Sequence, residues 1–434
     1  MKLVARRGPL PLYKGFLTGW GATTFGTGLV LPLTVAYLRE TLGLPTSGVS
    51  LYFALFAMAG LAVNPLAGKV ARAYGSGPAA VGATVLQAVG AAWLAAADSM
   101  AATVPAACLS GAGTGAYYAV QTPLLTKAFG NTALSRVLSG QHRISALTMA
   151  VGALLGGQAV ERLGEGGYTL CLAVNGVSYL VHGAMLVRLL RAERQPAPSG
   201  SGSAERDQSL ASSAEPAVVR GARGGRSVAL SDPVFLRLLL VQIALVIFGI
   251  AQVDTVVPAI LRNADLSVSA ISVVIACNTV GVILFQGLAL RIVERIGYVA
   301  SLTAAILIWV AAMAALTAAV LVPGAGVRLA LGALFGLVFA VGECLIAPSV
   351  QPLVTLTAPA GRLEGYAAAT SLAHGLGALV SPLVLLPVVD GGGVWSYLAL
   401  QLGGYGIALF ALLSFRARSA RRLACVPVGR ETIP

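Results

Sequence analysis

The sequence predicts an all-α polytopic membrane protein whose twelve transmembrane helices form two pseudo-symmetric six-helix bundles. Three observations support this fold class: an apolar composition, twelve apolar runs of membrane-spanning length, and a polar segment that separates six runs from the other six. Of the 434 residues, 57% are hydrophobic and 10% are charged, and the mean hydropathy is +0.84. Soluble proteins have about 45–50% apolar and about 25% charged residues, so this chain could not cover a water-facing surface.

Turn and charge signals separate the apolar runs, and each run is long enough to cross a bilayer. The basic N-terminal stretch continues directly into the first run, without a cleavage site after a short core. We therefore expect a retained first helix rather than a signal peptide. The predicted spans are 14–38, 50–70, 78–97, 101–126, 140–160, 168–190, 234–259, 268–290, 299–322, 327–350, 366–388 and 394–415.

The segment 191–231 is rich in Pro, Gly, Ser and Arg and has no apolar periodicity, which is typical of a flexible linker. It divides the chain into an N-terminal bundle (1–190) and a C-terminal bundle (232–416). A basic tail follows at 417–434.

The distribution of basic residues predicts the orientation in the membrane. If the N-terminus is cytoplasmic, 25 of the 29 Lys and Arg residues fall on the cytoplasmic side. One missed or added span would destroy this asymmetry, so it favours twelve spans with both termini in the cytoplasm. Arg residues far outnumber Lys residues, and Ala, Gly and Val are heavily used, which suggests a GC-rich bacterial genome; we therefore expect a bacterial inner membrane. The four basic residues that this orientation places on the outer side of the membrane are Arg39, Arg162, Arg262 and Arg328.

The second half of the chain weakly repeats the first. Residues 48–75 align without a gap on 270–297, and 140–157 align on 365–382. The matches fall at corresponding spans of each half, which indicates two six-helix bundles of similar orientation, related by an axis along the membrane normal.

Three motifs give the chain a resemblance to the major facilitator superfamily, and within it to the 12-span drug:proton antiporters. The second loop, "PLAGKVARAYGSG", has the family's glycines but carries Arg72 where an Asp is expected. The corresponding loop of the second half, "LRIVERIG", has the expected acidic-basic pair. The fifth span contains "GALLGG" at 152–157, which matches an antiporter pattern except for Ala153 in place of a Pro. The Arg that many drug antiporters carry in the fourth span is absent.

The resemblance implies the major facilitator fold: spans 1, 4, 7 and 10 line a central cavity, spans 2, 5, 8 and 11 join the bundles, and spans 3, 6, 9 and 12 face lipid. It also implies a cytoplasmic latch between the bundles. Because Arg72 replaces the family's acid, we predict a reversed pair of Arg72 with Glu364, and a symmetry-related pair of Glu294 with Arg143 or Arg136. These charges could instead be solvated loop residues. Three glycines, Gly152, Gly156 and Gly157, are predicted to permit close helix approach.

Two carboxylates lie well inside apolar spans: Asp254 in the seventh and Glu343 in the tenth. An ionised carboxylate at mid-membrane costs about 2.5–3.5 kcal/mol on insertion scales, so such a residue needs a partner, water or a proton. We therefore predict that Glu343 and Asp254 couple transport to protons. His374 could pair with Glu343. Structural hydrogen bonds are the alternative role for all three residues.

Polar and aromatic residues on the expected cavity spans form the predicted substrate site, because a mostly apolar pocket with a few polar groups suits an amphipathic organic molecule. Some of these aromatic rings could instead fill packing gaps. The candidates are Trp20, Thr24, Phe25, Tyr117, Tyr118, Gln121, Gln252 and Ser349.

The predicted function is secondary active transport, with proton-coupled export of a small amphipathic compound as the leading hypothesis. Proton-coupled import of a sugar or other nutrient is the alternative within transport, and a non-transporting receptor or enzyme is the alternative outside it. The sequence has no phosphate-binding loop, metal-ligand spacing or catalytic cluster, so we predict no enzyme activity, no cofactor and no metal. The scattered basic residues argue against nucleic acid binding. The expected partners are the substrate, protons and lipid, and we expect a monomer.

Overall fold

The computed structural model describes residues 10–129, 131–194, 231–359 and 362–423, and every long element within these ranges is helical. The predicted all-α fold class is therefore confirmed. The central part of the predicted linker, 195–230, and most of the predicted tail, 424–434, lie outside the described residues.

The first bundle contains six long helical segments, of which the first is interrupted. A 3₁₀ turn, a short helix and a π-helical turn continue α1 to Thr41. The elements are α1 (Leu10–Val30), η1 (Leu31–Leu33), α2 (Thr34–Ala36), η2 (Tyr37–Thr41), α3 (Thr46–Tyr74), α4 (Ser76–Ala95), α5 (Met100–Phe129), α6 (Asn131–Leu163) and α7 (Glu165–Arg194).

The second bundle follows the same order. Its first helix begins after Asp232, whose carboxylate accepts hydrogen bonds from the backbone N–H groups of Val234 (2.9 Å) and Phe235 (3.4 Å) and so caps the helix. The elements are α10 (Pro233–Leu245), η3 (Val246–Ile250), α11 (Ala251–Val253), α12 (Val256–Asn263), α13 (Val268–Ile296), α14 (Tyr298–Leu321), α15 (Ala325–Thr357) and α16 (Leu363–Leu423).

The count of helices is consistent with twelve spans. Ten described helices are long and apolar enough to cross a membrane. The last of these belongs to α16, which contains two predicted spans separated at Gly393, where the backbone leaves the helical region (φ 65°). The 30-residue helix α5 corresponds to the predicted fourth span.

The predicted internal repeat has a structural counterpart. Helices α3 and α13 are each 29 residues long, and each is followed by a glycine with positive φ, 94° at Gly75 and 82° at Gly297. Glycine adopts this conformation without the steric cost of a side chain, so it ends each helix with a sharp turn into the next.

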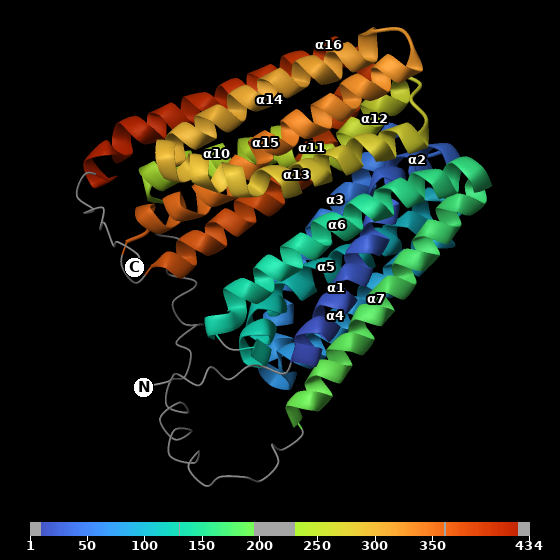
Figure 1. The fold of residues 1–434 in the computed structure, drawn as a ribbon, viewed down its shortest axis with the longest axis vertical. Helices are drawn as coiled ribbons and strands as arrows, with labels where there is room; N and C mark the ends of the chain where they lie inside the picture. Colours follow the sequence, from blue (N-terminus) through green and yellow to red (C-terminus); the bar gives the residue numbers. More distant parts are fainter. Residues whose placement is uncertain (1–9, 130, 195–230, 360–361, 424–434) are drawn as a thin grey trace.

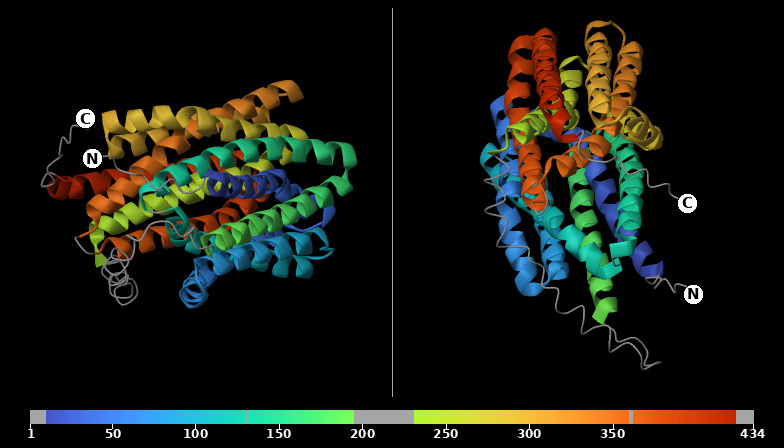
Figure 2. Two further views of the ribbon diagram at one scale, coloured as in Figure 1. Left: turned by 60° about the horizontal axis from the view of Figure 1, so that its bottom comes forward. Right: turned by 90° about the vertical axis from the view of Figure 1, so that its left-hand side faces the viewer.

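The two bundles converge at one end of the molecule and diverge toward the other (Figure 1). We call the end at which α7 stops and α10 starts the linker end, and the opposite end, where α2 and α12 are in contact, the distal end. The main contacts between bundles are α3 with α16 and α6 with α13, which agrees with the interface implied for spans 2, 5, 8 and 11. Figure 2 shows that the long helices within each bundle run side by side.

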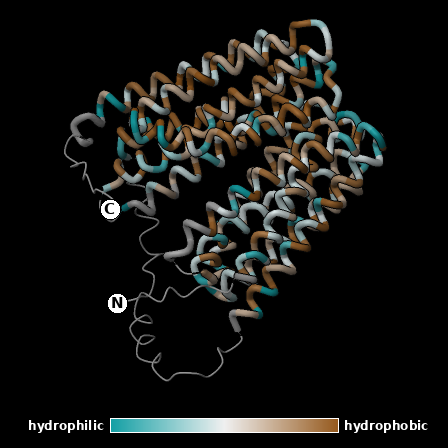
Figure 3. Tube along the Cα trace, viewed as in Figure 1, coloured by the Kyte–Doolittle hydropathy of each residue, from teal (hydrophilic) through white to brown (hydrophobic). Residues whose placement is uncertain are grey.

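Large apolar side chains cover much of the outer surface. Phe410 is 73% exposed, Leu284 65% and Trp395 63%. In Figure 3, hydrophobic positions extend along the helices of both bundles. Exposed apolar area on this scale is typical of a surface that contacts lipid.

The first helix of each bundle is broken on the distal side of its midpoint. In the first bundle the 3₁₀ turn η1, which contains Pro32, and the π-helical turn η2 replace regular α-helix. In the second bundle η3 is π-helical, and Asp254 and Thr255 form a non-helical turn between α11 and α12. Irregular backbone at membrane depth is tolerated where it is buried in protein or lines a cavity.

Candidate functional site

A cavity of about 740 Å³ lies between the bundles. This volume is within the range of about 300–1,000 Å³ that is common for small-molecule sites. The lining side chains of the first bundle come from α1 to α5 and α7, and those of the second come from the broken seventh span and α16. Spans 1, 4 and 7 thus line the cavity, as the resemblance implied. The tenth span does not contribute to this lining, because α15 packs behind, against α13 and α14.

Asp254 lies at the break between α11 and α12 and faces the cavity. Its side chain is half-buried, and no hydrogen-bond partner for its carboxyl group occurs among the described residues. The break directs this carboxyl toward a space large enough for a ligand. The structure therefore places the predicted coupling residue Asp254 in contact with the binding space.

His374, on α16, is also part of the cavity lining. Its Nδ1 lies 3.3 Å from the side-chain nitrogen of Gln242 on α10. The predicted pair of His374 with Glu343 is not formed in this structure, since His374 contacts Gln242 from the neighbouring helix instead.

Glu343 occupies a different environment. It is half-buried on α15, and its Oε2 is 3.5 Å from the Asn278 side-chain nitrogen on α13. Glu343 is not part of the cavity lining, although its carboxyl group is within electrostatic range of Asp254. The two predicted coupling acids thus differ in access: Asp254 faces the cavity, and Glu343 lies within the packing of the second bundle.

Of the predicted substrate residues, Tyr118 lines the cavity, and its side chain is 61% exposed. The adjacent Tyr117 points into the first bundle, where its ring stacks on Trp20 at 5.5 Å between centroids and its hydroxyl lies 3.2 Å from His182 Nε2. The Trp20 indole donates a 2.5 Å hydrogen bond to Ser145. Trp20 and Tyr117 therefore pack in the bundle core, which is the alternative role for the aromatic residues.

The other predicted substrate residues are also used in packing and do not line the cavity. The Thr24 hydroxyl bonds the Thr148 hydroxyl at 2.6 Å, and Ser349 donates to the Leu345 carbonyl at 2.6 Å. Gln252 is fully buried and accepts hydrogen bonds from side chains of the last span. Gln121 is buried, and Phe25 is partly buried against the core.

Sequence reasoning missed a group of cavity residues on α3 and α7, because these helices were assigned to the interface and the lipid face. Their signal is a group of three aromatic residues in "LYFALF" and a polar and an aromatic residue four positions apart in "NGVSY". The missed side chains are Tyr52, Phe53, Phe56, Asn175 and Tyr179.

The three predicted packing glycines have two roles. A Cβ atom at Gly152 would lie 2.3 Å from the Phe25 carbonyl oxygen, and one at Gly156 would lie 2.3 Å from that of Leu29, so both let α6 approach α1. A Cβ atom at Gly157 would lie 2.5 Å from Ser272 Oγ on α13. Gly157 thus lies at the contact between the bundles.

The distal end is closed by polar contacts between the bundles that the sequence did not predict. An Arg39 nitrogen lies 2.6 Å from the Asp390 carboxylate, with the two side chains 19% and 27% exposed. Asn263 donates to the same carboxylate at 3.1 Å, and Thr46 donates to it as well. Arg39 and Thr46 belong to the first bundle, and Asp390 and Asn263 belong to the second.

A second ion pair joins Glu40 of η2 to Arg262 of α12. Arg262 Nη2 lies 3.1 Å from the Glu40 carboxylate, and this hydrogen bonding raises the pKa of the Arg262 guanidinium. The two ion pairs, together with Thr46 and Asn263, are called the distal network below. Arg39 and Arg262 are two of the four basic residues that the sequence places on the outer side of the membrane. Their departure from the charge asymmetry is the signal that could have predicted the distal network.

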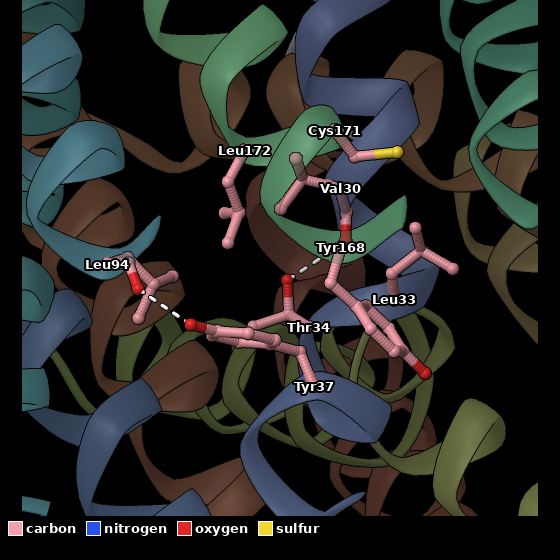
Figure 4. A pocket seen from close by; sticks show the side chains of 8 residues that line it. All are labelled: Val30, Leu33, Thr34, Tyr37, Leu94, Tyr168, Cys171 and Leu172. Carbon is pink, nitrogen blue, oxygen red and sulfur yellow. Dashed lines mark hydrogen bonds between the residues drawn. The ribbon is translucent and has the colours of Figure 1, made fainter. Parts of the chain in front are cut away.

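The broken part of the first span is fixed below the distal network. The Tyr37 hydroxyl donates to the Leu94 carbonyl of α4 at 2.9 Å, and the Thr34 hydroxyl donates to the Val30 carbonyl at 3.0 Å (Figure 4). The small cavity in Figure 4 shares Val30, Thr34, Leu94 and Leu172 with the large cavity. The distal wall of the binding space therefore includes Leu31 of η1, Thr34 of α2 and Leu94 of α4.

The predicted latch residues lie toward the linker end. Arg72, Arg143 and Glu294 are exposed and form no ion pair with any described side chain. Glu364 is in the first turn of α16, but its side chain lies outside the described part. The bundles diverge here, so the latch remains a prediction for a conformation that is closed at this end.

Comparison with known proteins gives a family and a fold. The family model described as Major Facilitator Superfamily matches residues 16–262, which is more than half of the chain. The chain belongs to the major facilitator superfamily. This major facilitator is a multi-pass membrane transporter and not an enzyme. A search of curated proteins gave no match.

Among solved structures, this transporter is similar to the nucleoside transporter NupG, with a TM-score of 0.71 at 11% identity over 94% of this chain and 99% of that chain. It is also similar to an auto-inhibited POT family peptide transporter, with a TM-score of 0.69 at 16% identity over 98% and 99% of the two chains. Identities this low show a shared fold alone. Within the described ranges, no cluster of His, Cys, Asp or Glu could hold a metal ion.

Proposed function

We propose that this protein is a proton-coupled secondary transporter that moves a small amphipathic organic compound by alternating access, with export across a bacterial inner membrane as the leading direction. The observation that carries the proposal is the 740 Å³ cavity between the bundles, which has a mostly apolar lining and one carboxylate, Asp254, at a helix break. Such a cavity surrounds an apolar body and orients it through a few polar groups.

The arrangement of contacts supports alternating access. The distal network joins the bundles at one end, while the bundles diverge at the linker end. With both termini in the cytoplasm, as the basic residues predict, the cavity opens to the cytoplasm, where an exporter collects its substrate. Closing the linker end and separating the distal network would expose the same cavity to the other side.

Two acids in different environments support proton coupling. Asp254 can exchange a proton with the cavity, and Glu343 lies behind the cavity wall next to Asn278. A carboxyl group in apolar surroundings is costly when charged, so binding and release of a proton can follow the change in its surroundings between the two conformations.

Import of a small nutrient is the second candidate. The similar solved structures include a nucleoside transporter and peptide transporters, and they share this fold. The direction of transport therefore has to be measured.

The test uses purified protein in liposomes with an imposed pH gradient, screened against amphipathic drugs, nucleosides, small peptides and sugars. We expect proton movement that depends on an amphipathic compound and that is lost in Glu343→Gln. Glu165→Gln, which changes an exposed acid in the first turn of α7, is the matched control. Compound flux that does not respond to the pH gradient would refute proton coupling, and flux of sugars or peptides alone would refute the proposed substrate.

A further inference from the structure

The two bundles contribute different chemistry to the cavity. Every Phe and Tyr residue in the described lining comes from the first bundle. The one carboxylate, Asp254, and the one histidine, His374, come from the second bundle. The aromatic wall, as we call these residues, consists of Tyr52, Phe53, Phe56, Tyr118 and Tyr179.

The charge of the lining is one-sided. Among the described residues around the cavity there is one carboxylate and neither Lys nor Arg. An anionic ligand would meet Asp254 without a strong counter-charge, whereas a cationic ligand would form an ion pair with it. Because a charge removed from water is costly unless it is paired, this lining favours cations over anions.

The aromatic wall favours the same ligands. Ring faces attract cations, and they also pack against flat or bulky apolar bodies. Tyr118, whose side chain is 61% exposed, lines the open space, and its ring makes one edge-to-face contact, with the adjacent Tyr117.

We infer that the transporter selects organic cations, with Asp254 binding the positively charged group and the aromatic wall binding the apolar body. This inference rests on the proposed function and specifies its substrate class. A ligand bound in this way touches both bundles, since its charge is held by the seventh span and its body by α3, α5 and α7. Its binding energy therefore depends on how the bundles are placed, which is what a substrate needs in order to shift a conformational equilibrium.

The test compares two probes of matched shape and opposite charge, tetraphenylphosphonium and tetraphenylborate, in equilibrium binding to purified protein in detergent, with protein-free micelles as the blank. We expect the wild-type protein to bind the phosphonium at least about tenfold more tightly than the borate, because only the cation has a counter-charge. Asp254→Asn should weaken phosphonium binding by roughly tenfold to a hundredfold. Asp98→Asn, which changes an exposed acid outside the cavity, should bind like wild type.

The aromatic wall is tested separately. Tyr118→Ala should weaken phosphonium binding about threefold to tenfold, and Tyr118→Phe should restore it because the ring is kept. Equal binding of borate and phosphonium to the wild-type protein would overturn the inference, and this comparison needs no variant to fold. Phosphonium binding unchanged in a monodisperse Asp254→Asn protein would overturn it too.

Failure of the inference can be told apart from failure of the proposed function. Proton-coupled flux of neutral compounds that persists in Asp254→Asn would refute cation selection and leave the transport function intact. Charge-selective binding without any flux in liposomes would refute the proposed transport and support the assignment of the site.

Discussion

The distal network gives a quantitative prediction about the conformational equilibrium. Asp390 accepts hydrogen bonds from Arg39, Asn263 and Thr46, and its pair with Arg39 has side chains only 19% and 27% exposed. Replacing Asp390 with Asn keeps the shape and removes the charge. A hydrogen bond to a charged group contributes about 1.5–3 kcal/mol and an exposed ion pair about 0–1 kcal/mol, so we take about 1.4 kcal/mol for this partly exposed pair.

The network joins the bundles only when the distal end is closed. The loss of interaction free energy therefore destabilises the distal-closed conformation alone. A change of about 1.4 kcal/mol is tenfold in an equilibrium constant, so Asp390→Asn should raise the ratio of distal-open to distal-closed molecules about tenfold. The Glu40–Arg262 pair is 35% and 39% exposed. Glu40→Gln should therefore shift the same ratio only about twofold.

The assay is a distance distribution between spin labels at two exposed distal positions on opposite bundles, Thr169 and Ala325, with the accessible cysteines replaced. Asp98→Asn is the control for loss of a distal acid outside the network. An unchanged distribution in Asp390→Asn, or a larger change in Glu40→Gln than in Asp390→Asn, would show that the partly buried pair does not hold the distal end closed.

Three further predictions concern ligand binding, transport rate and thermal stability. Glu343→Gln should leave binding of tetraphenylphosphonium within about twofold of wild type, because Glu343 is not part of the cavity lining; a large loss of binding would place this acid at the substrate site. Gly157→Ala should slow transport without unfolding the protein, because its Cβ atom would lie 2.5 Å from Ser272 Oγ of the other bundle. Gly166→Ala is the control and should not slow transport, because nothing lies within 4 Å of a Cβ atom at that position. Equal transport rates for the two variants would contradict this prediction. Trp20→Phe should reduce thermal stability by about 1 kcal/mol through loss of the indole hydrogen bond, with little change in phosphonium binding; weaker binding at unchanged stability would return Trp20 to the substrate site.

The sequence is sufficient to predict the helices and their pairing into bundles, because the thickness of a bilayer fixes the length of each apolar run. It also identifies the repeat, and the glycines that end α3 and α13 lie at corresponding positions of that repeat. The extent of the last helix differs in detail: α16 continues to Leu423, beyond the predicted boundary at 416.

The candidate site is less predictable, because it depends on the rotation of each helix about its axis. Tyr117 and Tyr118 are neighbours in sequence, yet one packs in the bundle core and the other lines the cavity. Apolar spans have polar residues on few positions, so periodicity does not reveal which face turns inward. The distal network was missed for another reason, since the pair of Arg39 with Asp390 joins residues 351 positions apart.

The composition of the distal network bears on how the transporter responds to membrane voltage. The first bundle supplies one positive and one negative side chain, Arg39 and Glu40, and the second supplies Arg262 and Asp390. When these surfaces separate, each carries away no net charge, so a transmembrane potential does almost no work on the opening itself. Any voltage dependence of transport would then report the charge of the transported species, including any protons that move with or against the substrate, and electrical measurements could count those charges directly.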